Sequence, residues 1–98
     1  MADIIWSPQA LEALDSICLH IASDSESSAT NFANKVMETV ASIAQFPLLG
    51  SMVPEYELAE LRERIHQNYR IIYRIRVETI EIVVIYHGAR QLPTRPPA

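Results

Sequence analysis

Residues 68–90 read NYRIIYRIRVETIEIVVIYHGAR, and they restrict the fold of this chain more than any other stretch. Apolar and basic side chains alternate along NYRIIYRIRV, which is the two-residue period of a β-strand with one buried face. A second apolar run, TIEIVVIYH, follows a break at Val77 and Glu78. A tight turn at that break predicts an antiparallel hairpin, with the pairs Ile75–Ile80, Arg74–Glu81 and Tyr73–Ile82.

The two faces of this hairpin differ in chemistry if the alternation continues through both strands. The predicted core face carries Tyr69, Ile71, Tyr73, Ile75, Ile80, Ile82, Val84 and Tyr86. The opposite face carries Arg70, Ile72, Arg74, Arg76, Glu81, Val83, Ile85 and His87. We expect the second face to stay at least partly open to solvent, with Glu81 as the cross-strand partner of Arg74.

Two helical patterns and a short apolar run precede the hairpin. The run DIIW predicts a brief strand within residues 1–6. Ser7 is then a suitable N-cap, and Pro8 fits the first helical position, where its missing N–H is no loss. Apolar residues recur at helical spacing from there to about Ser23.

The segment SDSESS separates this helix from a second one. Ser23 with Glu26 can form a capping box, and Asp24 and Ser25 are alternative caps. Pro47 ends the second helix. Residues 7–46 therefore predict an antiparallel helical hairpin.

The order of the predicted strands and helices along the chain indicates a single α+β domain over residues 1–98. The helical hairpin should pack on one face of a mainly antiparallel sheet of three to four strands. Residues 47–60 are expected to form an irregular loop whose acidic part, PEYELAE, is solvated. Strands should occupy residues 61–90, and the proline-rich residues 91–98 should form a flexible, frayed tail.

The net charge of −4 is unevenly distributed. Residues 1–60 carry nine acidic side chains against Lys35 alone, whereas residues 61–98 carry seven arginines against three glutamates. This asymmetry predicts a basic surface on an acidic body, suited to nucleic acid or to an acidic protein segment. We find no signal peptide and no apolar run long enough to span a membrane, so we expect a cytoplasmic protein without a membrane partner.

Few classes of catalytic site are compatible with these residues. Gly50 and Gly88 are the only glycines, so no glycine-rich phosphate loop is possible, and the three histidines lie far apart in the sequence. We therefore expect neither a metal site nor a cofactor. One group of residues could form a catalytic site that needs no metal. The arginines would stabilise the charge on a phosphate and the histidine would transfer a proton; the group consists of Arg70, Arg74, Arg76, His87 and Arg90. A solvated sheet face and a partner-binding face are the two alternatives.

The chain resembles the RelE/ParE superfamily of toxins from type II toxin–antitoxin systems over nearly its whole length. The resemblance rests on IIWSPQALEALDSI, FANKVMETVASIAQFPLLGSMVPE, LRERIHQNYRIIYRI and IVVIYHGARQL, in that order. It implies a helical hairpin against a curved, mainly antiparallel sheet. RelE-like members cleave mRNA on the ribosome, whereas ParE-like members poison DNA gyrase, and this chain is more similar to the ParE-like branch.

The resemblance also implies partners and site residues. Arg70 and Arg90 match functional arginines of RelE-like nucleases, and they would be catalytic candidates together with His87. The lysine pair of those nucleases is missing, with Arg62 and Arg64 nearest to its place, and their late tyrosine is missing too. The expected function is therefore a toxin neutralised by its cognate antitoxin and acting on DNA gyrase. The first alternative is a ribosome-dependent mRNA endonuclease. The second alternative is an inactive relative that only binds antitoxin. The expected partner-binding residues are Arg70, Arg74, Arg76 and Arg90.

Overall fold

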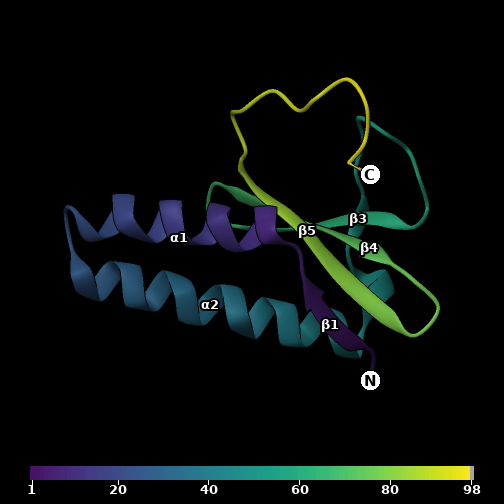
Figure 1. Cartoon of the computed structure of the whole chain (residues 1–98), viewed down its shortest axis with the longest axis horizontal. Helices are drawn as coiled ribbons and strands as arrows, with labels where there is room; N and C mark the ends of the chain where they lie inside the picture. The colour runs from purple at the N-terminus through teal and green to yellow at the C-terminus, as the bar shows by residue number, and fades with distance from the viewer. Residues whose placement is uncertain (98) are drawn as a thin grey trace.

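A computed structural model of the chain describes residues 1–97 and places a helical hairpin against a mixed sheet (Figure 1). Its elements are β1 (Asp3–Trp6), α1 (Pro8–Ala22), α2 (Glu26–Gln45), the 3-10 turn η1 (Pro47–Leu49), β2 (Ser51–Met52), β3 (Leu61–His66), β4 (Tyr69–Ile75) and β5 (Thr79–His87). Within the described residues, the strand order is β1-β5-β4-β3-β2, with β1 parallel to β5 and the other pairs antiparallel. The predicted α+β class is confirmed. A fifth strand, the two-residue β2, lies inside the stretch expected to be an irregular loop.

Serine caps set the starts of both helices. The Ser7 hydroxyl accepts a hydrogen bond from the Ala10 N–H (3.0 Å) and donates one to the Val83 carbonyl (2.6 Å), so it also ties the start of α1 to β5. Of the caps considered for α2, Ser25 is the one used, and its hydroxyl accepts from the Ser28 N–H at 3.2 Å. The helix ends directly before Phe46 and Pro47, as predicted.

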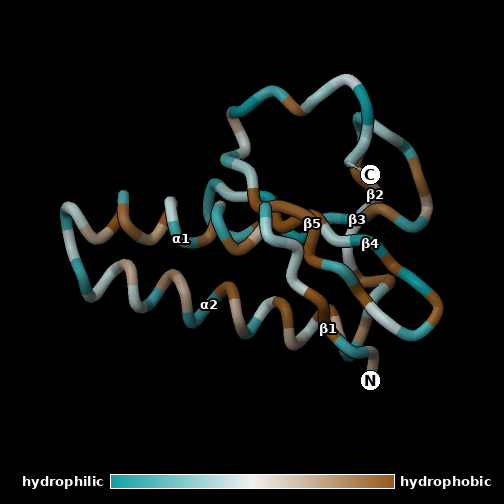
Figure 2. Tube along the Cα trace, viewed as in Figure 1, coloured by the Kyte–Doolittle hydropathy of each residue, from teal (hydrophilic) through white to brown (hydrophobic). Residues whose placement is uncertain are grey.

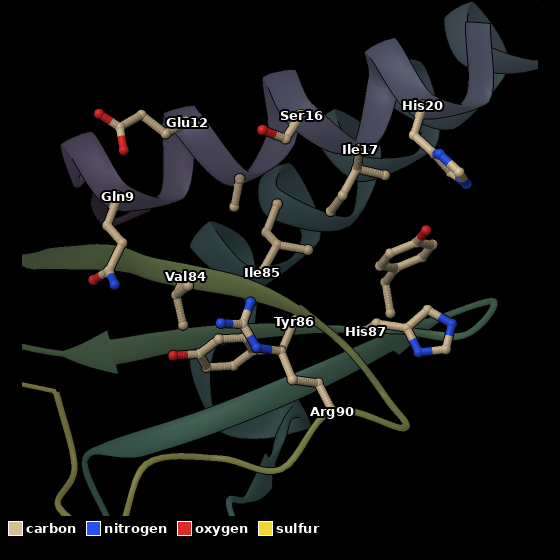
Figure 3. A pocket seen from close by; sticks show the side chains of 12 residues that line it. Gln9, Glu12, Ser16, Ile17, His20, Val84, Ile85, Tyr86, His87 and Arg90 are labelled. Atoms are coloured by element: carbon tan, nitrogen blue, oxygen red, sulfur yellow. The ribbon is translucent and has the colours of Figure 1, made fainter. Parts of the chain in front are cut away.

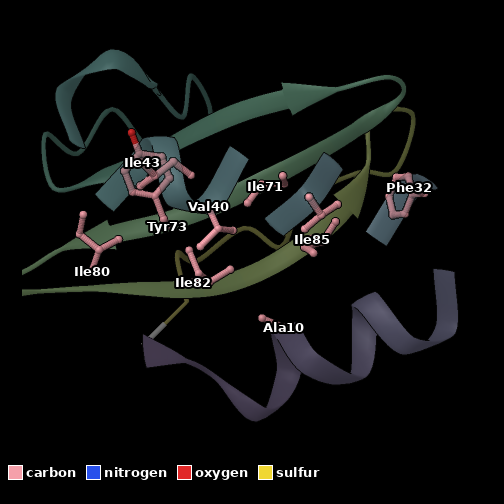
Figure 4. Close-up of a cluster of buried hydrophobic side chains, with 10 residues drawn as sticks. Ala10, Phe32, Val40, Ile43, Ile71, Tyr73, Ile80, Ile82 and Ile85 are labelled. Atoms are coloured by element: carbon pink, nitrogen blue, oxygen red, sulfur yellow. The ribbon is translucent and has the colours of Figure 1, made fainter. Parts of the chain in front are cut away.

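The helical hairpin covers one face of the sheet and encloses the main hydrophobic core (Figure 4). This core contains Ala10, Phe32, Val36, Val40, Ile43, Ile71, Tyr73, Ile80, Ile82 and Ile85. The Tyr73 hydroxyl, at its edge, donates to the Pro47 carbonyl (2.5 Å) and accepts from the Gly50 N–H (3.1 Å). A β-carbon at Gly50 would lie 2.1 Å from that hydroxyl oxygen, so only glycine fits there.

A β-bulge in β5 changes which side chains reach this core. The register follows the prediction from Ile75–Ile80 to Tyr73–Ile82, but the next pair is Ile72–Val84, which leaves Val83 as an extra residue. The extra residue reverses the alternation beyond it. Ile85 therefore packs in the main core with 3% exposure, while Val84 and Tyr86 turn to the other face. The predicted face assignment is wrong from Val84 onward.

The opposite face of the sheet, which was expected to stay at least partly open, holds a second hydrophobic cluster that covers part of it. The cluster consists of Val53, Leu61, Ile72, Val83, Val84, Tyr86 and Leu92. Tyr56 and Leu58 pack against it, so the segment PEYELAE is not simply solvated. Figure 2 shows that strongly hydrophobic residues run along β5, which lies between both clusters.

The C-terminal segment crosses this second face rather than only extending from it. Leu92 is buried in the second cluster, and the Tyr56 hydroxyl donates to the Pro93 carbonyl at 2.6 Å. Arg74 donates a hydrogen bond to the Pro97 carbonyl. Ala98, the last residue of the expected tail, lies outside the described residues.

Candidate functional site

Arg70 in β4 is buried and is bound by two carboxylates. Its side chain bonds Glu55 through Nη1 (2.7 Å) and Nη2 (2.8 Å), and Glu63 through Nε (2.6 Å). Arg70 is only 8% exposed. Glu63 reaches it because β3 pairs Glu63 with Ile72, so Glu63 and Arg70 are diagonal neighbours on one face of the hairpin. Glu55 approaches from the loop before β3.

These ion pairs determine the charge state of the site. The hydrogen bonds that Arg70 donates to Glu55 raise the pKa of Arg70 above its usual value, and those to Glu63 add a smaller effect. Burial opposes this rise without cancelling it. The Arg70 guanidinium in turn lowers the pKa of Glu55, against the effect of desolvation. Arg70 is therefore a permanent cation whose charge is already balanced by its two neighbours.

His87 and Arg90 lie at the end of β5, where a short turn holds them (Figure 3). The Arg90 N–H donates to the His87 carbonyl at 2.9 Å, and the Ala89 N–H donates to His87 Nδ1 at 3.1 Å. The His87 ring stands edge-on to Tyr69, with 5.2 Å between ring centroids. The Arg90 guanidinium lies 5.1 Å from the centroid of the Tyr86 ring, a cation–π contact. Both side chains are exposed.

Two surface hollows meet at His87. One, of about 460 Å³, lies between α1 and the end of β5 and is lined by His87, Arg90 and His20 among others. The other, of about 640 Å³, contains Arg70 with its two glutamates and also borders on His87. The structure thus brings His87 close to each candidate arginine separately. Arg70 and Arg90 themselves do not line a common hollow.

The remaining arginines make local contacts. Arg76 forms the ion pair with Glu81 (2.9 Å), whereas Arg74 bonds the C-terminal segment. The backbone ladder does place Arg74 opposite Glu81, but the predicted side-chain pair is wrong. Arg62 donates to the carbonyls of Ala59 and Gly50, at 3.0 Å each, and Arg64 donates to Ser42 Oγ at 3.4 Å.

Sequence reasoning missed both carboxylate partners of Arg70. The hairpin pattern contained a signal for Glu63, because a turn at Gln67 and Asn68 places it diagonally from Arg70. No comparable signal existed for Glu55, whose position depends on the path of a loop. Across residues 1–97, no three histidine, cysteine, aspartate or glutamate side chains gather closely enough to hold a metal ion. Neither helix in that range is long and apolar enough to cross a membrane.

Comparisons with known proteins agree with this architecture. A family model described as "ParE toxin of type II toxin-antitoxin system, parDE" matches residues 4–92. A solved structure titled "Chromosomal ParDE TA system from P. aeruginosa" is similar in fold, with a TM-score of 0.72 and 21% sequence identity. The similarity covers 89% of this chain and 96% of that one. No curated protein matches the sequence.

Proposed function

This chain belongs to the ParE toxin family of type II toxin–antitoxin systems, and we propose that it acts on DNA gyrase and is neutralised by a cognate antitoxin. The toxin–antitoxin context follows from family membership. The choice of gyrase as the target rests on the resemblance to the ParE-like branch, and on one structural observation about Arg70.

The engagement of Arg70 by Glu55 and Glu63 carries the preference for gyrase over RNA cleavage. A nuclease that works without a metal needs free cations to stabilise the charge that develops on the phosphate. Here the guanidinium is buried, and a phosphate that approached it would meet two carboxylates. Arg62 and Arg64, nearest to the missing lysine pair, donate to groups of the protein itself. These contacts favour a structural role for the Arg70 region.

A different arginine is better placed to contact the antitoxin. Arg90 is exposed and lies beside the hollow between α1 and β5, so its guanidinium can meet a carboxylate without breaking an ion pair. We include Arg74 and Arg76 in the partner-binding face as secondary contacts, because each already has a partner within the chain. Arg70 contributes to this face indirectly, because it holds the loop that contains Glu55.

A two-part experiment separates the candidate targets. The purified toxin is added to gyrase in a DNA supercoiling reaction, and in parallel to a translating extract in which mRNA length is followed. We expect inhibited supercoiling and intact mRNA, with both reactions normal when the toxin is first mixed with its antitoxin. Cut mRNA with normal supercoiling would overturn the proposal in favour of the nuclease. No effect in either reaction, and no growth arrest in cells, would indicate an inactive relative.

A further inference from the structure

We infer that residues 53–60 and residues 91–97 form one latch over the second hydrophobic cluster, and that the ion pair between Glu55 and Arg70 keeps it closed. The two segments open together, although β3, β4 and β5 lie between them in the sequence. This inference does not depend on the proposed target. It rests on the contacts that hold each segment, on the contact between the two, and on the residues that they cover.

The C-terminal segment, residues 91–97, has few backbone groups with which to hold itself on the sheet. It reads QLPTRPP, so three of its seven residues are prolines, which have no N–H to donate. Two side chains donate hydrogen bonds to its carbonyls: Tyr56 to Pro93 (2.6 Å) and Arg74 to Pro97. The position of the segment therefore depends on side chains from other parts of the chain.

Tyr56 is the contact between the two segments of the latch. Leu92, the one buried residue of the C-terminal segment, lies in the second cluster, and Tyr56 packs against that cluster from the loop before β3. The N–H groups of Tyr56 and Glu57 both donate to the Val53 carbonyl, at 3.1 and 2.9 Å, which forms a compact turn. A movement of this turn would carry Tyr56 away from the C-terminal segment.

Glu55 connects this turn to β4. It directly precedes Tyr56, and its carboxylate accepts two hydrogen bonds from Arg70, at 2.7 and 2.8 Å. Arg70 is itself fixed, because it is only 8% exposed and also bonds Glu63 at 2.6 Å. Bidentate pairs of arginine and carboxylate are among the stronger hydrogen-bonded contacts in proteins. The Glu55 pair therefore anchors the turn and, through Tyr56, the C-terminal segment.

The closed latch covers apolar residues of the sheet. Ile72, Val83 and Val84 are at most 4% exposed, although they belong to the cluster on the face away from the helices. Figure 1 shows the loop before β3 and the C-terminal segment on this side of the sheet, with both helices on the other. Segments held by few contacts open more readily than the core of a fold. The second cluster is therefore uncovered in a state that keeps the helices and the sheet folded.

The first test follows release of the C-terminal segment in the full chain by limited trypsin digestion at the bond after Arg90. Glu55→Gln removes the charge that anchors the turn, and Glu57→Gln makes the same change at an exposed glutamate of the same loop. We expect the first variant to lose the segment at least about tenfold faster than the wild type under native conditions, and the second within about twofold. Val40→Ala destabilises the main core alone and should also stay within about twofold, which distinguishes local opening from global unfolding.

Hydrogen exchange tests the coupling in the opposite direction. Leu92→Ala weakens the hold of the C-terminal segment, and Thr94→Ala changes an exposed residue of the same segment. The amides of Tyr56 and Glu57 should exchange at least about tenfold faster in the first variant, and within about twofold of the wild type in the second. Equal exchange in both variants, or an unchanged rate of trypsin cleavage in Glu55→Gln, would show that the segments open independently and would overturn the inference.

A further variant keeps the test decisive if Glu55→Gln does not fold. Tyr56→Phe removes only the hydroxyl that donates to Pro93 and keeps the ring in the cluster. Loss of one hydrogen bond should speed release of the C-terminal segment by trypsin at least about threefold. A rate equal to that of the wild type would overturn the inference in this case.

Discussion

Arg70 in β4 holds both β3 and the loop that precedes it, because its guanidinium binds Glu63 in β3 and Glu55 in that loop. Glu63 is 11% exposed, while Glu55 is 42% exposed. Burial makes the loss of a partner expensive, since the remaining charge cannot be fully solvated. The two contacts should therefore contribute unequally to stability.

Replacing the more buried partner tests this view. Glu63→Gln keeps a similar shape but removes one of the two charges that balance Arg70, so we expect a loss of about 2 kcal/mol in the free energy of unfolding. Urea denaturation measures it. The control is Glu38→Gln, which breaks the exposed ion pair with Lys35 and should cost less than about 0.5 kcal/mol. Equal small losses in both variants would contradict a structural role for the Arg70 cluster.

The lowered pKa of Glu55 predicts that the stability of the protein depends on pH. Its pKa is lowered in the folded state by Arg70, so its ionised form is favoured by folding. The resulting stability is fully present above the usual glutamate pKa of about 4.3, and it is lost as pH falls through the lower folded value. Urea unfolding from pH 6 down to pH 3 should show a difference between the wild type and Glu55→Gln that shrinks at the acidic end. A difference that stays constant over this range is the opposing result.

Local rules predicted the start of α1 and the end of α2, whereas the bulge in β5 escaped them. Ser7, Pro8 and Pro47 act over a few residues, and their effects could be predicted from the sequence alone. The apolar run IVVIY contains no polar residue to show which side faces the helices, so an extra residue at Val83 leaves no trace in the pattern.

The bulge can be tested with a pair of isoleucine variants. Ile85→Ala removes a side chain from the main core and should lower the free energy of unfolding by about 3 kcal/mol. Ile65→Ala changes a side chain that is 60% exposed and should cost less than about 0.5 kcal/mol. Chemical denaturation of both variants measures these values. A cost at Ile85 as small as the cost at Ile65 would show that Ile85 is not packed in the main core, and would contradict the arrangement described for β5.

The whole molecule has its sheet between two apolar layers, with the helical hairpin on one face and the loop and C-terminal segment on the other. The order of strand and helix patterns predicted the first layer, and the superfamily resemblance predicted the family. The second layer depends on contacts between distant segments, such as Tyr56 with Pro93, which no local pattern contains. The candidate site was predicted only in part, because burial and ion pairing change what Arg70 can do.

The arginine-rich C-terminal part predicts salt-sensitive association with an acidic antitoxin segment. Charged pairs between exposed groups accelerate encounter and are screened by salt. We expect the association rate to fall as salt rises from about 50 to 500 mM, and Arg90→Gln to be slower at low salt and less salt-dependent. Stopped-flow binding measures both rates, with Lys35→Gln on α2 as the control for a general loss of positive charge. An association rate that does not change with salt contradicts this part of the account.

We propose DNA gyrase as the target of this toxin. The most direct measurement is the amount of cleaved plasmid DNA that remains attached to gyrase when the purified toxin is present. Cleaved DNA should increase with toxin concentration and return to background when antitoxin is added in excess. Plasmid that stays uncut at every toxin concentration, while the same preparation shortens ribosome-bound mRNA, would contradict the claim.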